Sequence, residues 1–341
     1  MERAFEIYHV KPKETLQQIA ERFEMDAEEL KTFHHLHYKA AGLRWFGNFV
    51  AVEKIAVPYN FKTKSQREKE HHANFPSKTF NKNFYEKSYL VKEKLAGKRS
   101  EELEFEYTAD IELTEGNGQI IASISTKNFL KNGNVPDDKI SANSLACLEA
   151  INPVSFMLNQ NGKPLQLANP EVYAKRFADK RKDMEDFMVG KVSSDYFDKF
   201  QGILKNPDLI FRKFNSQLLF QLLFPGMGWF HKNGQWQEEK VLVTNSFPVK
   251  MKFSASYQHE ETGFAETKIS GTIAEQWELQ DILVNKKRTE SVENPAEAVL
   301  QQTYFTDKEK KTLHSAEANI TLFSNGNAYT SHMLKVSTKE L

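Results

Sequence analysis

The chain has 341 residues, enough for one large domain and one small domain. Its 46 Lys and Arg residues balance its 46 Asp and Glu residues, so no overall field attracts nucleic acid or an anionic membrane. The single cysteine, Cys147, excludes an internal disulfide and is typical of a reducing compartment. We expect no membrane span, because no stretch is apolar over the length that a bilayer requires.

The first 58 residues carry the signals of a strand, two capped helices and a second strand. Apolar and aromatic residues near the start predict a strand, which Pro12 ends because it lacks a backbone donor. Thr15 with Gln18 forms a capping box ahead of apolar residues at helical spacing. Asp26 is the N-cap of a second helix, and residues 55–58 predict the closing strand.

This order of elements, together with the run Thr15-Leu16-Gln17-Gln18-Ile19-Ala20-Glu21-Arg22-Phe23, resembles a LysM module. LysM modules are small βααβ domains known mainly for holding N-acetylglucosamine glycans such as peptidoglycan and chitin. The resemblance covers about residues 5–58. Lys13-Glu14 stands where the family usually has Gly-Asp, and the path from Tyr38 to Phe49 is longer and more aromatic than the usual loop.

The resemblance places a binding groove between the loop after the first strand and the loop after the second helix. It implies nine candidate residues for binding a glycan or a protein partner: Lys11, Pro12, Lys13, Glu14, Thr15, His35, His37, Tyr38 and Gly42. The first ten residues contain no apolar signal-peptide region, so we expect a cytoplasmic protein as written, or export by a route that needs no signal. Because peptidoglycan lies outside the cytoplasm, protein docking is the alternative use of this groove.

The rest of the chain predicts a basic linker at 61–83 and a β-rich domain at 84–341. Basic residues outnumber acidic ones in the linker, which has no apolar period. Glycine turns around Gly116-Asn117-Gly118, Asn161-Gly162 and Asn325-Gly326 predict hairpins. Four further strands are expected near 239–244, 249–257, 264–273 and 278–284.

Asn169-Pro170 starts a helical insert at about 169–224, because Asn is a good N-cap and proline fits the first helical turn. Strands, a helical insert and further strands resemble the open half-barrel lipid-carrier folds, and also β-rich domains of unknown function common in Bacteroidetes-type proteins. The sequence therefore predicts an α+β protein. A LysM module at 1–60 and the linker precede a larger antiparallel, half-barrel-like domain.

No residue set typical of an enzyme or a metal centre is identified. Cys147 lies in an apolar, helix-like context and is interpreted as a buried thiol rather than a nucleophile. His34, His35, His37 and the pair His71-His72 are interpreted as surface residues rather than metal ligands. No carboxylate pair for glycoside hydrolysis can be selected, and the aromatic residues between 211 and 230 are expected in the core.

We therefore expect a non-enzymatic LysM-containing binding protein without a cofactor, which recognises an N-acetylglucosamine glycan or uses the module for docking. One alternative is a cytoplasmically loaded adaptor, effector or structural component of a contractile, type VI-like secretion apparatus. LysM modules also occur in such machines, and these need no signal peptide. A cell-wall hydrolase ranks below both. The expected partner is a glycan or a protein and not nucleic acid.

Overall fold

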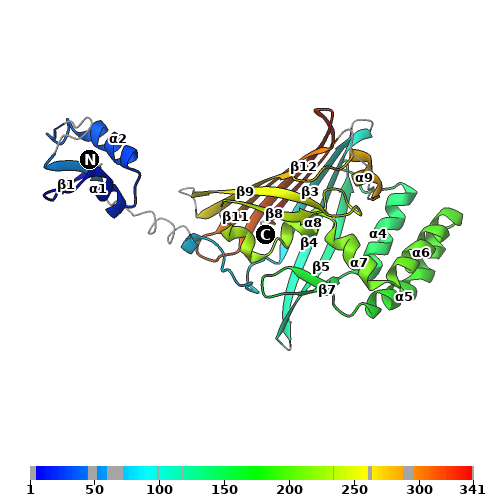
Figure 1. Ribbon diagram of the computed structural model, residues 1–341. Coiled ribbons are helices and arrows are strands. Elements are labelled where there is room, and N and C mark those ends of the chain that lie inside the picture. Colours follow the sequence, from blue (N-terminus) through cyan, green and yellow to red (C-terminus); the bar gives the residue numbers. More distant parts are fainter. Residues whose placement is uncertain are drawn as a thin grey trace. The chain divides into compact units, whose positions relative to one another are not determined.

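The computed structural model describes residues 5–44, 52–59, 72–97, 100–116, 118–232, 234–259, 263–286 and 295–339. The chain divides into two compact units, Met1–Asn74 and Phe75–Leu341 (Figure 1). The aromatic path from Trp45 to Phe49, the first part of the predicted linker with His71, and the predicted turn residue Asn117 lie outside the described residues. No helix in the described part of the chain is long and apolar enough to cross a membrane.

The N-terminal unit contains the four elements predicted from the capping signals. They are β1 (Phe5–His9), α1 (Leu16–Arg22), α2 (Ala27–His37) and β2 (Lys54–Pro58), and the two strands pair antiparallel. Thr15 and Gln18 form the expected capping box, and the Asp26 side chain accepts hydrogen bonds from the first turn of α2. A small apolar core joins both helices to β2 through Ile19, Ala20, Leu30, Ile55 and Val57.

His34 is buried, so its expected position on the surface is wrong. Its Nδ1 accepts a hydrogen bond of 3.1 Å from the Ala56 backbone N–H, and its Nε2 lies 2.8 Å from the Arg44 carbonyl oxygen. These partners require a neutral ring with the proton on Nε2. The ring therefore connects α2 to β2, a contact that the spacing of histidines in the sequence cannot reveal.

The larger unit is built on one antiparallel sheet of eleven strands. In spatial order these are β7 (Pro164–Leu167), β6 (Val154–Leu158), β5 (Gln119–Lys131), β4 (Ser100–Gly116), β3 (Ser88–Gly97), β13 (Asn327–Thr338), β12 (Leu313–Ser324), β11 (Glu297–Asp307), β10 (Phe264–Ile273), β9 (Val249–His259) and β8 (Gln235–Lys240). The first and last strands are joined by an ion pair of 2.6 Å between Lys163, just before β7, and Glu238 of β8. The sheet is therefore strongly curved, because its two edges meet at this contact.

Helices complete the larger unit. They are α4 (Lys139–Ile151), α5 (Glu171–Phe187), α6 (Lys191–Leu204), α7 (Pro207–Asn215), α8 (Leu218–Leu223), the 3₁₀ turn η1 (Met227–His231) and α9 (Leu279–Val284). Figure 1 shows α4 to α7 gathered at one end of this unit, whereas α8 lies against the sheet and packs on β12. The fold is α+β with a β-rich larger part, as predicted.

Two predicted strands differ from the structure: the strand expected near 239–244 lies earlier, as β8 at Gln235–Lys240, and the segment predicted at 278–284 forms α9 instead of a strand. Leu279, Ile282 and Leu283 recur at helical spacing, and Asn285 ends the helix in the left-handed conformation. The aromatic segment between 211 and 230 is core, as expected: Phe220, Trp229 and others are buried against the sheet.

The sheet has a covered face, on which α8 and η1 pack, and an open face opposite. On β3, Tyr89 and Val91 point to the covered face and are fully buried, whereas Lys92 and Lys94, at the alternate positions further along the strand, belong to the open face. The same alternation buries Ala316, Ala318 and Ile320 of β12. Each side chain's place along a strand therefore decides whether it meets solvent or the core.

Candidate ligand site

The first predicted groove loop is held by Glu14. Its carboxylate accepts hydrogen bonds of 3.0 Å from the Tyr8 hydroxyl and from the Lys11 backbone N–H, and it forms an ion pair of 2.6 Å with Arg22. The Lys11 N–H holds the pKa of the Glu14 carboxyl below its usual range, helped by Tyr8 and Arg22. Only 5% of the Glu14 side chain is exposed, so this carboxylate stabilises the loop rather than presenting itself to a ligand.

The other residues of this loop divide into two kinds. Thr15 uses its hydroxyl oxygen to accept from the Gln18 N–H and is the N-cap of α1. Lys11, Pro12 and Lys13 are exposed, and Lys13 adopts a left-handed backbone with φ of 67°. The side chains available to a partner are therefore the two lysines and the proline.

The second predicted groove loop follows α2. His37 packs on Phe5 of β1 and on Phe33, with ring centroids 5.2 and 4.5 Å apart. His35 and Tyr38 are half-buried, and Gly42 is exposed with φ of 65°. His37 therefore contributes to packing, whereas the accessible part of the predicted site on this loop is Tyr38 and its neighbours.

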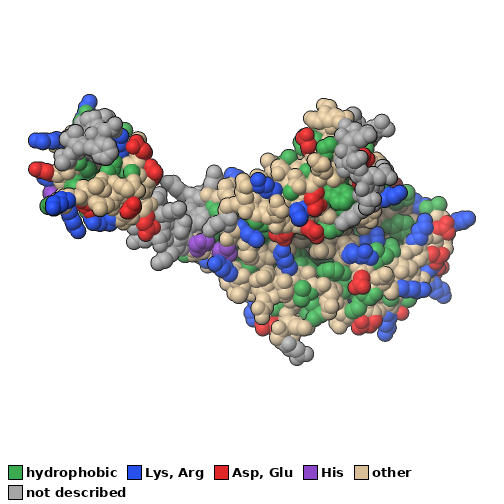
Figure 2. Space-filling model, viewed as in Figure 1, with side chains coloured by type: hydrophobic (Ala, Val, Ile, Leu, Met, Phe, Trp, Pro, Cys, Tyr) green, Lys and Arg blue, Asp and Glu red, His purple; other side chains and the backbone are tan. Residues whose placement is uncertain are grey.

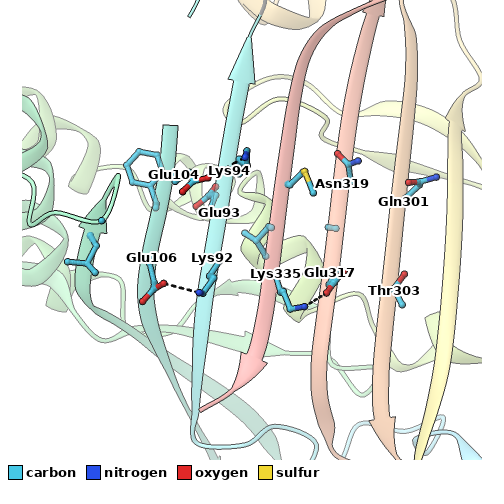
Figure 3. Close-up of a pocket in the computed structure, with 16 residues that line it drawn as sticks. Lys92, Glu93, Lys94, Glu104, Glu106, Gln301, Thr303, Glu317, Asn319 and Lys335 are labelled. Atoms are coloured by element: carbon cyan, nitrogen blue, oxygen red, sulfur yellow. Dashed lines mark hydrogen bonds and ion pairs between the residues drawn. The ribbon is translucent and has the colours of Figure 1, made fainter. Parts of the chain in front are cut away.

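The open face of the larger sheet has a depression of about 630 Å³ lined by charged and polar side chains (Figure 3). Lys92 lies directly opposite Glu106 and pairs with it at 3.2 Å, and Lys335 lies opposite Glu317 and pairs with it at 2.5 Å. Cross-strand pairs of this kind stabilise a solvated sheet surface. Figure 2 likewise shows acidic and basic side chains interspersed over the visible face of this unit. The depression therefore has charge compensation within itself.

The covered face carries three polar side chains close together in an otherwise apolar row. Glu93 follows Tyr89 and Val91 on β3, and its Oε1 lies 2.5 Å from Nε2 of His332 on β13. The Tyr107 hydroxyl of β4 donates to the other Glu93 oxygen at 3.3 Å. Burial, reinforced by the Glu93 charge, raises the pKa of Tyr107 well above its usual value, so the phenol keeps its proton.

Two pockets meet at Glu93. The first, of about 460 Å³, lies between β3 to β6 and helices α4, α7 and α8, with walls that include Ile124, Phe129, Leu145 and Phe220. The second, of about 540 Å³, extends along β3, β12 and β13 towards α9. Thr244 lines both pockets and is exposed to solvent, so it marks a place where both can be reached. We call the two together the covered-face site.

A separate pocket of about 420 Å³ lies where the two sheet edges meet, beside Lys163, Glu238 and Lys240. Lys240 is 8% exposed, and its Nζ lies 4.3 Å from the centre of the Trp229 ring. Burial lowers the pKa of Lys240 to about 8, opposed by the charge of Glu238 at 3.9 Å. Lys240 is thus a buried cation with an incomplete counter-charge.

Cys147 lies on α4 and is buried, as predicted. Burial raises the pKa of its thiol to about 12, so the sulfur stays protonated and unreactive at neutral pH. Among the described residues, no group of three or more His, Cys, Asp or Glu side chains is arranged to hold a metal ion.

The residues that the sequence predicts for a binding site do not include Glu93, Tyr107, His332 or Lys240. The alternation of β3 contains a signal for one of them. Glu93 lies on the same face as Tyr89 and Val91, so the pattern places a charged residue on the apolar side of the strand. To predict His332 and Tyr107 as its neighbours, one must know which strands pair with β3, and strand pairing cannot be read from the local sequence.

No protein-family model and no curated protein matches this chain. The geometry of the covered-face site and of the N-terminal unit is therefore the basis for a function.

Proposed function

We propose that this protein is a non-enzymatic binding protein, whose larger unit holds an apolar ligand and whose N-terminal unit docks to a second partner. The observation that carries the first part is the covered-face site. Its volumes fall within the roughly 300–1,000 Å³ of small-molecule sites, and its walls are apolar with few convergent polar groups. This combination favours retention of an apolar molecule by burial of surface.

The chemistry around this site supports binding rather than turnover. The Cys147 thiol keeps its proton because burial raises its pKa, and the Tyr107 phenol does so for the same reason. The Glu93 carboxylate is engaged by both His332 and Tyr107. No nucleophile paired with a general base is therefore apparent among the described side chains of the covered-face site.

A blocking substitution tests the ligand proposal. Leu145→Trp places a bulky indole ring on the α4 wall of the first pocket, whereas Leu165→Trp on β7 adds the same ring at an exposed position. We expect single-chain lipids to raise the melting temperature of the unaltered protein and of the Leu165→Trp variant, but not of the Leu145→Trp variant. An equal gain in both variants would contradict the proposed pocket.

The N-terminal unit is proposed to be a LysM-like docking module. Support comes from its strand, capped helix, capped helix, strand order and from the exposed Lys11 and Lys13 beside α1. The first candidate partner of this module is an N-acetylglucosamine glycan. The alternative is a protein, such as a spike or tube component of a contractile secretion apparatus, and the internal engagement of Glu14, Thr15 and His37 favours this alternative.

Sedimentation with purified peptidoglycan separates these two partners. We expect recovery of the full chain in the pellet, loss of recovery for a chain lacking residues 1–74, and weaker recovery for Tyr38→Ala. Tyr59→Ala is the matched control, because Tyr59 is an exposed tyrosine beyond β2. If the full and the truncated chains pellet equally, glycan binding is excluded and the docking proposal moves to a protein partner.

A further inference from the structure

Glu93 lies where the two pockets of the covered-face site join, and it lines both of them. The neighbouring covered-face positions on its own strand are Val91, which is fully buried, and Leu95. A charge at such a position costs free energy unless it is compensated, and an apolar side chain would serve the sheet equally well. The pair that it forms with His332 therefore calls for an explanation beyond packing.

The pair leaves hydrogen-bonding capacity directed at the pockets. His332 uses Nε2 for Glu93, and no hydrogen bond from its Nδ1 to another described residue is present. The His332 ring lines the second pocket, as does Thr330 beside it on the same face, whose hydroxyl donates to the Ala96 carbonyl oxygen at 3.0 Å and keeps only its acceptor capacity. Thr244 supplies a further hydroxyl at the junction. A ligand lying across the junction thus meets donors and acceptors at one point and apolar walls on both sides.

We infer that the ligand of the covered-face site is a single-chain amphiphile with an uncharged, hydroxyl-bearing head group, which binds at Glu93 and His332. This inference rests on the proposed function of the larger unit. The hydroxyls donate to the Glu93 carboxylate and pair with Nδ1 of His332, while the chain lies against Phe129, Leu145 and Phe220 in the first pocket. Each polar atom of the ligand is then satisfied in a site that is otherwise apolar.

The charge of the site selects an uncharged head. Both oxygens of the Glu93 carboxylate already have a partner, Oε1 in His332 and Oε2 in Tyr107, so the site holds no free counter-ion for a charged ligand. A carboxylate head would face Glu93 in a partly desolvated place, and an ammonium head would compete with His332 for the same oxygens. A monoacylglycerol meets the requirement, whereas the fatty acid of the same chain length does not.

Titration calorimetry of the full chain tests this selection at pH 7.5. The probes are a monoacylglycerol and the fatty acid of the same chain length, both below their critical micelle concentrations. We expect the monoacylglycerol to bind at least about tenfold more tightly, since a hydrogen bond to a charged group carries roughly that effect. Tighter or equal binding of the fatty acid would overturn the inferred head group.

A double variant tests the anchor itself. Glu93→Leu with His332→Leu removes both partners together, which avoids leaving one charge buried alone. We expect its monoacylglycerol affinity to fall about tenfold and its preference over the fatty acid to vanish. The matched control is Glu317→Leu with Lys335→Leu, which removes an ion pair from the open face of β12 and β13. This control should keep both the monoacylglycerol affinity and the preference over the fatty acid.

The outcomes separate the two proposals. If the double variant keeps the affinity and the preference of the unaltered protein, the anchor is wrong while the binding function stands. If neither probe binds the unaltered protein, the binding function of the larger unit is itself wrong. A melting curve of each variant shows whether a lost affinity reflects the site or a failure to fold.

Discussion

Lys240 shows how a single buried charge shapes the larger unit. Its ammonium group lies over the Trp229 ring, and its nearest carboxylate, on Glu238, is already paired with Lys163 at 2.6 Å. The cation–π contact and the distant carboxylate compensate only part of the desolvation. The lowered pKa of Lys240, about 8, reports this imbalance.

Replacing Lys240 with methionine should stabilise the larger unit. The change removes a desolvated charge, keeps an unbranched side chain over Trp229, and leaves Glu238 paired with Lys163. We expect the free energy of unfolding to rise by about 1–3 kcal/mol in urea titrations. Lys163→Met should have the opposite effect, because it removes the close partner of Glu238. A loss of stability in Lys240→Met would mean that the cation–π contact dominates.

The same residue predicts a pH dependence. The unfolded lysine titrates near 10.5 and the folded one near 8, so between these values the unfolded state holds more protons. Stability due to Lys240 therefore rises with pH from about 8 to 10.5, by up to about 3 kcal/mol. The stability gap between the unaltered protein and Lys240→Met should close over this window. A gap that stays constant would contradict the lowered pKa.

His34 predicts a pH dependence of the same sign for the N-terminal unit, but at lower pH. Burial lowers its pKa below 6.5, the Arg44 carbonyl opposes this, and His35 adds to it. As pH falls below 6.5 the unfolded state gains a proton that the folded ring resists, so stability is lost. Protonation also removes the acceptor of the Ala56 N–H. Hydrogen-exchange protection of Ala56 should fall between pH 7 and 5.5, and this pH effect should be weaker in His34→Gln.

At the scale of elements, two of the three expected caps and the alternation of the strands could be predicted from the sequence. The exception is Asn169, because the N-cap of α5 is Pro170 and makes no side-chain hydrogen bond. Contacts between distant segments could not be predicted. Thr15 and Asp26 signal their helices because a cap and the turn that it serves are adjacent. The sequence predicts Glu14 in a binding groove, yet its carboxylate binds Tyr8 and Arg22, because the packing of β1 on α1 determines its partners. The sequence predicts a strand at 278–284, where α9 forms, because a short apolar run fits either element.

Gly271 of β10 is a residue whose identity depends on a contact with a neighbouring strand. It lies opposite Phe253 of β9, and a Cβ at this position would collide with the Phe253 ring. That ring cannot move freely, since it is buried against Trp229 and Trp236. The close approach of the two strands therefore needs glycine here.

Gly271→Ala should lower the free energy of unfolding by about 1–3 kcal/mol, the usual effect of overfilling a packed core. Gly202→Ala is the matched control on α6, where an added Cβ meets open space. For Gly202→Ala we expect the free energy of unfolding to rise by about 0.5–1 kcal/mol, because alanine has a higher helix propensity than glycine. Chemical unfolding followed by circular dichroism measures both. Equal effects of the two substitutions would rule out the collision.

At the scale of the whole molecule, one pairing joins distant parts of the larger unit. β3 pairs with β13, although more than 200 residues separate them, and this pairing places His332 beside Glu93. A strand's own pattern specifies which face it buries but not its partner. The individual strands could thus be anticipated, whereas the covered-face site appears only when the sheet is assembled.

The two units have separate apolar cores. Each has its own apolar core, and the two cores share no residue: one includes Ile19 and Leu30, the other extends from Phe84 to Val336. A unit with its own core is expected to unfold on its own. Removing residues 1–74 should therefore leave the melting temperature of the larger unit within about 2 °C, which is under about 1 kcal/mol at this size.

The truncated chain should also bind the monoacylglycerol with unchanged affinity, because every lining residue of the covered-face site lies beyond Asn74. Calorimetry on residues 75–341 beside the full chain measures this directly, and Glu93→Leu with His332→Leu in the truncated background gives the baseline. If truncation weakens binding as much as the double variant does, the N-terminal unit takes part in the ligand site and the two functions are coupled. Unchanged affinity makes them separable, so that docking and ligand binding can be removed one at a time.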